Sequence, residues 1–172
     1  MDNPGYSQLV PTVFEMEEEI DEVTRANAHK LEMQGITPHY GVNSKKLSTR
    51  FNPKSFDTII FQFPHSGSRD PKYNRNPNFV MIRKFLKEAS LILKPNGTAM
   101  ITTVNSAHYE GAFQFQEAAE ASEFSAPESY RFDPKVFKGY SHVNTHDDES
   151  GVKNHKKFTT WVFHKQNAAS SI

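Results

Sequence analysis

The sequence predicts an α/β fold with a largely parallel sheet, because apolar, β-branched runs alternate with amphipathic helical segments. The clearest strand, Asp57–Phe63, is continuously apolar rather than alternating, as a strand covered on both faces would be. The clearest helix, Asn78–Leu93, repeats apolar residues on one face, and KPNG breaks it where a tight turn is expected. Thr98–Val104 then predicts the next strand, which completes a βαβ unit.

A strand, a helix and a second strand are expected ahead of this unit. Leu9–Glu15 is short and β-branched, which favours a strand. Residues 16–34 repeat apolar side chains at helical spacing, carry acids in the first turn and stop at Gly35, so they predict an amphipathic helix. Ile36–Asn43 is the second expected strand, weakened by its proline and glycine.

The C-terminal part of the chain predicts one more helix and two more strands. Residues 108–124 favour a helix that Gly111 weakens. Residues 127–134 favour a short strand. Lys156–Lys165 alternates well enough to predict a final strand.

One domain over residues 9–165 is expected from the length of 172 residues, with residues 1–8 as a linker and 166–172 as a disordered tail. Lys and Arg together number 20, as do Asp and Glu, so no overall basic field announces a nucleic-acid partner, although a local patch fits a neutral total. The lack of cysteine excludes disulfides and fits an intracellular compartment. No apolar run approaches the roughly 18 residues of a membrane span, and the N-terminus does not resemble a signal peptide.

Polar residues come at the end of the strand Asp57–Phe63. In open α/β sheets, ligands bind beyond the carboxyl ends of the strands. Gln62 would present an amide at that rim, Pro64 would end the ladder, and His65 would lie in the following loop. A plainer alternative is that Gln62 only caps the strand and that His65 is an exposed loop histidine. The residues alone leave both alternatives open.

The loop at residues 64–77 is basic and carries one tyrosine. Its side chains could follow a phosphate backbone, with Tyr73 as a stacking platform for a base, or could simply be solvated. The residues concerned are Arg69, Lys72, Tyr73 and Arg75. A smaller basic cluster with the same two interpretations comprises Lys153, Lys156 and Lys157. His142 and His146 lie in a polar stretch that is typical of a loop, so we expect no metal site there.

Three segments together resemble one family. FDTIIFQFPHSG, the helix ending in LILKPNGTAMIT, and FKGYSHVNTH are similar to the Rossmann-like domain of large-subunit rRNA (uridine-N(3))-methyltransferases. In that family the first motif usually reads F-D-x-I-I-F-N-F-P-H-x-G, and a Gly-Tyr-x-His segment recurs near the end of the domain. The resemblance implies a Rossmann-like class I three-layer sandwich. It also implies methyl transfer from S-adenosylmethionine (SAM) to a ring nitrogen of uridine in rRNA, in an intracellular setting that is nucleolar in a eukaryote and otherwise cytoplasmic.

The resemblance also implies a cofactor site. Glu15 falls where class I methyltransferases place the acid that binds the ribose hydroxyls, and Asn43 falls where the family usually has Asp near the adenine. Glu15 fits equally as an acid at a helix N-terminus, and Asn43 as a turn residue. The full set implied for the cofactor is Glu15, Asn43, Ser44, Gln62 and Phe63.

The same resemblance implies catalytic roles for Gln62, Pro64 and His65. Gln62 replaces the family's usual Asn, at a position resembling the motif with which amino-methylating enzymes hold a planar target nitrogen. His65 is the candidate general base for the ring nitrogen of uridine, which must lose its proton. A target inside an RNA helix would first be unstacked. The expected RNA contacts are Arg69, Lys72, Tyr73, Arg75, Tyr140 and His142.

One part of the family's pattern is missing. The family opens with a strand and a glycine-rich turn, commonly Gly-Glu-Gly-Asp-Phe-Ser-Phe, whereas only Gly5 precedes Leu9 here. We therefore expect a fold that lacks its first strand. In the class I strand order that strand lies between the ribose-binding strand and the strand Asp57–Phe63, so the apolar edges of these two strands would face a gap or pair with each other. The chain is then a piece of a longer protein, or a partner strand or second copy completes the sheet in a homodimer, or the cofactor site is lost. The rival to the enzyme is thus a non-catalytic, methyltransferase-like binding or assembly module.

Overall fold

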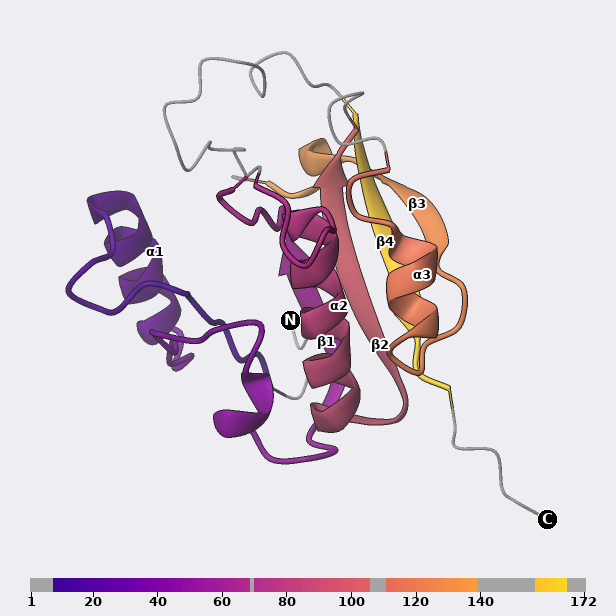
Figure 1. Ribbon diagram of the computed structural model, residues 1–172. Coiled ribbons are helices and arrows are strands. Elements are labelled where there is room, and N and C mark those ends of the chain that lie inside the picture. Colours follow the sequence, from indigo (N-terminus) through magenta and orange to yellow (C-terminus); the bar gives the residue numbers. More distant parts are fainter. Residues whose placement is uncertain (1–7, 69, 106–110, 139–156, 167–172) are drawn as a thin grey trace.

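The computed structural model describes residues 8–68, 70–105, 111–138 and 157–166 (Figure 1). The expected linker and tail lie almost wholly outside these residues. Within them, no helix is long and apolar enough to cross a membrane. The elements in chain order are α1 (Glu22–Glu32), η1 (Leu47–Thr49), β1 (Phe56–Gln62), α2 (Pro77–Ile92), β2 (Leu93–Val104), α3 (Phe115–Glu120), β3 (Glu128–Phe132), η3 (Pro134–Val136) and β4 (Phe158–His164).

The sheet has four strands in the order β1-β2-β4-β3. β1 and β2 are parallel and α2 connects them, so the predicted βαβ unit is confirmed. β4 runs antiparallel to both β2 and β3, so the expectation of a largely parallel sheet holds only for the first pair.

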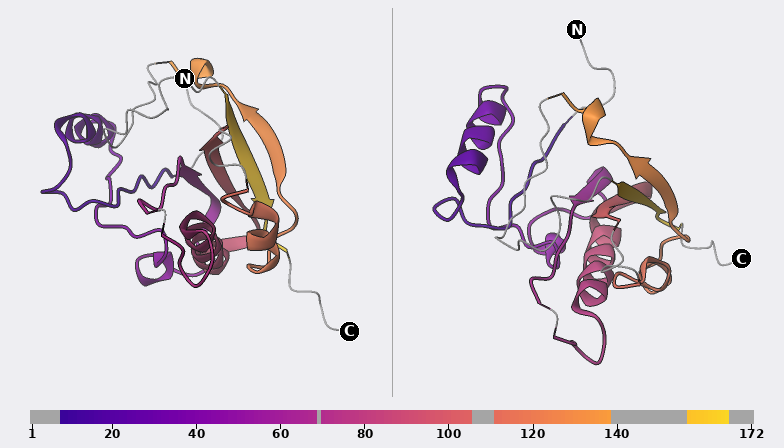
Figure 2. Two further views of the ribbon diagram at one scale, coloured as in Figure 1. Left: turned by 45° about the horizontal axis from the view of Figure 1, so that its top comes forward. Right: turned by 90° about the horizontal axis from the view of Figure 1, so that it is seen from above.

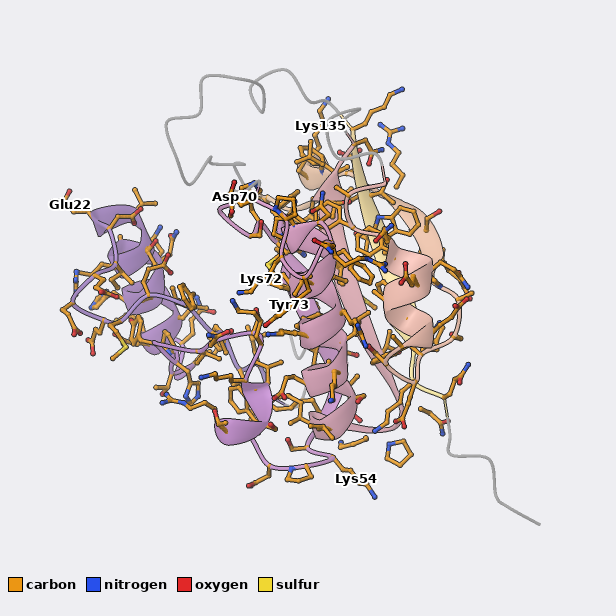
Figure 3. The ribbon with its side chains drawn as sticks, in the orientation of Figure 1. Glu22, Lys54, Asp70, Lys72, Tyr73 and Lys135 are labelled. Carbon is orange, nitrogen blue, oxygen red and sulfur yellow. The ribbon has the colours of Figure 1, made fainter. Side chains whose placement is uncertain are left out.

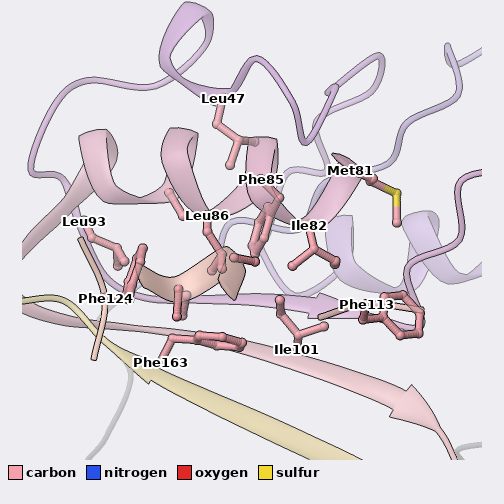
Figure 4. Close-up of a cluster of buried hydrophobic side chains, with 14 of the residues drawn as sticks. Leu47, Met81, Ile82, Phe85, Leu86, Leu93, Ile101, Phe113, Phe124 and Phe163 are labelled. Atoms are coloured by element: carbon pink, nitrogen blue, oxygen red, sulfur yellow. The ribbon is translucent and has the colours of Figure 1, made fainter. Parts of the chain in front are cut away.

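The core lies between one face of this sheet and the helices α2 and α3 (Figure 4). Ile82, Phe85 and Leu86 form the buried stripe of α2, and they pack against Ile101 of β2 and Phe163 of β4. Burying each of these side chains contributes about 1.5–3 kcal/mol to stability. Their period near 3.6 residues in α2 is the pattern that made this helix predictable.

The KPNG segment forms a bulge inside β2 rather than a turn before it. Phe56 pairs with Leu93 and Thr58 pairs with Thr98, so the register shifts over these residues. Asn96 takes the left-handed φ of 63° that the bulge requires. A Cβ on Gly97 would lie 2.9 Å from the carbonyl oxygen of Lys94, so only glycine fits this close approach.

The N-terminal segments are less regular than expected. Neither predicted strand forms as a full strand; the two segments are joined by an isolated parallel bridge between Thr12 and His39 and by a few backbone hydrogen bonds around it. The amide of Val13 donates to the carbonyl of His39 at 2.9 Å, and the amide of His39 donates to the carbonyl of Pro11 at 2.9 Å. The helix α1 starts six residues later than predicted. It lies beyond the β1 edge of the sheet, away from α2 and α3 (Figures 1 and 2).

β1 is an edge strand within the described residues, since β2 is the one strand that bonds to it there. No backbone hydrogen bond joins it to residues 9–15 in the described part of the chain, so the two apolar edges do not pair with each other. Ile60 is 58% exposed, which corrects the prediction that β1 is covered on both faces. Ile60, Met100 and Val162 are cross-strand neighbours on this side of the sheet, which we call the open face.

Candidate functional site

The carboxyl end of β1 presents Gln62 to solvent. Gln62 pairs with Thr102 of β2, its side chain is exposed, and its amide makes no hydrogen bond to any described residue. The chain then turns sharply, because Phe63 takes a left-handed φ of 49° while its N–H still donates to the carbonyl of Thr102 at 2.8 Å. Pro64 is buried. The rim therefore ends with a polar amide whose donors and acceptor are available to a ligand.

His65 is held by its own loop. The N–H of Gly67 donates to Nδ1 of His65 at 3.0 Å, and Gly67 reaches this position with a φ of 72°. The N–H of Ser66 donates to Oδ1 of the buried Asn78 at 2.9 Å, which ties the loop to the first turn of α2. Because Nδ1 accepts a hydrogen bond, the neutral ring carries its proton on Nε2. Nε2 is thus a donor in this arrangement.

Aromatic rings support the rim on the side of β3 and β4. The ring of Phe63 lies 5.4 Å from that of Phe158 and 6.2 Å from that of Phe132. Phe132 stacks on Phe137 at 5.5 Å. Edge-to-face and stacked pairs of this kind hold ring positions, so Phe63 is fixed by packing as well as by its backbone bond.

The predicted cofactor residues Glu15 and Asn43 lie on two segments that pair in parallel. The carbonyl of Val13 accepts from the amide of Val42 at 2.9 Å, and the carbonyl of Glu15 accepts from the amide of Gly41 at 2.8 Å. These bonds bring Glu15 and Asn43 to the same end of the pair. The Glu15 side chain is exposed and can bind hydroxyl groups.

Asn43 has a structural role that the sequence left open. Its Oδ1 accepts from the amide of Lys45 at 2.9 Å, which is the bond expected of a turn residue. Asn43 and Ser44 are half-buried. Their polar groups and the Glu15 carboxylate suit the ribose and adenine of the cofactor that the resemblance implies, but the described residues contain no glycine-rich turn for its amino-acid end.

The basic loop contains a tight turn that displays Tyr73. The amides of Lys72 and Arg75 donate to each other's carbonyls at 2.9 and 3.0 Å, and Tyr73 and Asn74 both have left-handed φ values, 54° and 57°. This is the geometry of a type I′ turn. Tyr73 lies at the tip of this turn, beside the exposed Lys72, and is 77% exposed (Figure 3).

Arg75 anchors this turn. Its guanidinium forms an ion pair with Glu117 of α3, donates to Oε1 of Gln114 at 3.1 Å and lies 4.4 Å above the ring of Phe79. The sequence grouped Arg75 with the RNA contacts, whereas these bonds commit its charge to fixing the loop against α2 and α3. The other three predicted contacts, Arg69, Tyr140 and His142, lie outside the described residues.

A groove of about 530 Å³ opens at the same end of the sheet. Of the residues that line this groove, the sequence analysis had singled out only Lys157. It gave no signal for Arg131, because a cation in an exposed, alternating strand normally indicates only a solvated face. The lining residues are Asn105, Ser129, Tyr130, Arg131, Lys157, Phe158 and Thr159.

Solved structures with the same fold include methyltransferases and proteins without a stated activity. YcgJ from Bacillus subtilis matches with a TM-score of 0.53 and 13% identity, over 94% of this chain and 83% of its own. A SAM-dependent methyltransferase from Methanosarcina mazei matches with a TM-score of 0.51 and 12% identity, over 91% and 82%. A possible exported protein from Bordetella parapertussis matches with a TM-score of 0.51 and 15% identity, over 93% of this chain but only 54% of its own, so the chain spans about half its length. At such identities the likeness shows the fold, which is Rossmann-like.

The sequence itself gives the more specific result. A search of the curated proteins finds no significant match. A family model described as rRNA (uridine-N3-)-methyltransferase BTM5-like matches residues 2–144, which is most of the chain and includes every described site residue up to η3. The chain therefore belongs to the BMT5-like family of rRNA (uridine-N3-)-methyltransferases.

Proposed function

We propose that this chain is the catalytic domain of a SAM-dependent RNA methyltransferase that methylates a ring nitrogen of uridine in rRNA. Membership of the family supports the reaction. The observation that carries the proposal is the exposed Gln62 amide, unbonded within the described residues, two residues before a buried proline and three before an oriented histidine. An intracellular location, nucleolar in a eukaryote, is part of the same proposal.

In this proposal, Gln62 hydrogen-bonds the edge of the uracil and holds it in the orientation that in-line transfer requires. When bound, SAM supplies an activated methyl group to the target nitrogen. His65 donates from Nε2 to a uracil carbonyl oxygen, which stabilises the ring once its nitrogen has lost a proton to water. The alternative role, a general base at Nδ1, requires the bond from the Gly67 N–H to break first.

Glu15, Asn43 and Ser44 would hold the ribose and adenine of the cofactor. Glu15 would bind the ribose hydroxyls through its exposed carboxylate, and Asn43 and Ser44 would border the adenine. Gln62 and Phe63 would border the methyl-donating end. These assignments rest on the parallel pairing that brings Glu15 and Asn43 together.

Calorimetric titration of the purified chain with SAM and S-adenosylhomocysteine tests the proposal. Micromolar binding, followed by transfer of labelled methyl groups to rRNA, is the expected result. A folded chain that binds neither compound would contradict the claim that this chain alone is an enzyme. Circular dichroism on the same sample establishes that the chain is folded.

A second candidate function is a non-catalytic binding or assembly module. The observation that favours it is the free edge of β1, which bonds to no further strand in the described residues and carries the exposed Ile60. Such an edge accepts a strand from a partner or from a second copy. Light scattering coupled to size-exclusion chromatography tests this. A dimer, or a mixed complex, without cofactor binding favours the module, and a monomer that binds SAM excludes it.

A further inference from the structure

The groove beside β3 and β4 is built from polar donors on a rigid ladder. Arg131 and Thr159 are direct cross-strand partners. Ser129 lies two residues before Arg131 in β3, and Lys157 lies two residues before Thr159, just ahead of β4, where its carbonyl still bonds to Asn105. Alternate residues of a strand share a face, so these four side chains lie on one side of the ladder. The groove therefore collects one guanidinium, one ammonium and two hydroxyl groups on a single face.

Two further bonds fix its floor. Thr159 Oγ1 donates to the side-chain Oδ1 of Asn105 at 2.8 Å, and the backbone N–H of Asn105 donates to the carbonyl of Lys157 at 3.0 Å. Because the side-chain oxygen of Asn105 accepts from Thr159, its side-chain Nδ2 group is left as a donor. The groove thus offers donors and positive charge.

The two cations that line the groove have no acidic partner among the described residues. Arg131 and Lys157 are exposed and form no ion pair with any acid in the described residues. The two acids nearest to Arg131 in sequence bond to other groups. Glu128 accepts from the hydroxyl of Tyr130, and Oδ1 of Asp133 accepts from the amide of Lys135 at 3.0 Å. A third cation, Lys135 of η3, lies at the same end of the sheet (Figure 3).

We infer that this groove binds the phosphodiester backbone of the RNA next to the target nucleotide. Arg, Lys, Ser, Thr and Asn side chains are the usual donors to phosphate and sugar oxygens. The groove lies at the same end of the sheet as the candidate site, because Asn105, which lines it, follows the end of β2, and Gln62 pairs with Thr102 of that strand. The inference rests on the proposed function, and it names a part of the RNA-binding surface outside the loop at residues 64–77.

Fluorescence anisotropy with a labelled oligouridine, over a series of potassium chloride concentrations, tests the inference. The double variant Arg131→Gln, Lys157→Gln is expected to bind at least about fivefold more weakly. Its slope of log affinity against log salt should be smaller by about 0.7 for each lost phosphate contact. The control is Lys84→Gln, Lys87→Gln, which removes the same charge from the exposed side of α2 and should bind within about twofold of the wild type.

Three results would overturn the inference. The groove variant and the control would bind the oligouridine equally well, or an acidic peptide would compete as strongly as RNA, or the wild type would bind no RNA. Thermal melting of both variants guards against a folding defect, because the four replaced side chains are exposed. Titration with SAM separates the two failures. If the wild type binds SAM and RNA and the groove variant binds RNA equally well, this inference alone is contradicted. If the wild type binds neither SAM nor RNA, the proposed function is contradicted.

Discussion

A single left-handed residue decides which side chains face the rim of the candidate site. Phe63 pays about 1–2 kcal/mol for its positive φ, and its ladder bond to Thr102 and its ring contacts with Phe158 and Phe132 offset that cost. The turn it makes leaves Gln62 as the last side chain on the strand and puts the following loop within reach of α2. The site therefore depends on backbone geometry as much as on the identity of its polar residues.

Replacing Gln62 by alanine is expected to reduce methyl transfer and leave stability unchanged. A hydrogen bond to the base edge is worth about 1–3 kcal/mol when the partner is left unpaired, so single-turnover rates should fall at least about tenfold. The melting temperature should not move, because the amide bonds to no described residue. Gln62→Asn, which restores the family's usual residue, is the matched control and should retain activity. A Gln62→Ala enzyme with full activity would remove this residue from the mechanism.

The helices differ in what holds them. α2 is capped at both ends, since Oδ1 of Asn76 accepts from the amide of Asn78 at 2.9 Å, and Nζ of Lys165 donates to the carbonyls of Ser90 and Leu93 at its C-terminus. α1 buries only Ala28 among its residues. The aspartate that caps it, Asp21, therefore matters more to α1 than a cap matters to a packed helix.

Substituting Lys165 by methionine is expected to destabilise the fold. The change keeps the apolar stem but removes two charge-assisted bonds to carbonyls at the end of α2, which is worth about 1–3 kcal/mol. Urea unfolding measures the loss. Lys84→Met on the exposed side of α2 should change the free energy of unfolding by less than about 0.5 kcal/mol. Equal effects of the two substitutions would show that the cap contributes nothing.

The cap of α1 should be lost in acid. The hydrogen bond from the Thr24 amide, 2.6 Å long, lowers the pKa of Asp21 below its usual value of 3.8. A carboxyl with a lowered pKa stabilises the folded state above the unfolded pKa, and this contribution disappears as pH falls through the folded pKa. The Thr24 amide resonance in an NMR titration should therefore shift with a midpoint below 3.8. In Asp21→Asn that shift should vanish, and a midpoint above 3.8 would contradict the assignment.

The molecule as a whole has one well-covered sheet face and one open face. α2 and α3 bury Ile101 and Phe163 completely, whereas Ile60 on the open face is 58% exposed. The N-terminal pair at Thr12 and His39 is not bonded to β1 in the described residues. An apolar edge beside an apolar face is the surface on which partner strands and second copies dock.

Alanine at two isoleucines of neighbouring strands measures whether the open face is covered in solution. Ile101→Ala should cost about 2–5 kcal/mol, because it leaves a cavity in the core. Ile60→Ala should cost less than about 0.5 kcal/mol if the face is solvated. Urea unfolding at several protein concentrations gives both values. A loss at Ile60 as large as that at Ile101, and dependent on concentration, would show that a second copy covers the face.

Local patterns predicted β1, α2 and β4 because each has an apolar period or run that its own neighbours do not override, and β3 was predicted from a short, mostly exposed segment. The late start of α1 was not predictable from that period, since the amide of Met16 bonds to the Glu19 carboxylate and Asp21 takes over as the cap. The KPNG bulge was missed for a similar reason. Whether a turn ends a strand or interrupts it depends on the partner strand, here β1.

The amino-acid sequence by itself determined the α/β class, the βαβ unit and the family, because apolar periods and a short polar motif are local properties. It also pointed to Gln62, His65 and Tyr73, whose positions after a strand or in a turn follow from neighbouring residues. Only the tertiary structure decided that Nδ1 of His65 is already bonded and that Arg75 is an anchor. It alone placed Arg131 beside Lys157. Those outcomes depend on contacts between residues far apart in the chain, which no local pattern encodes.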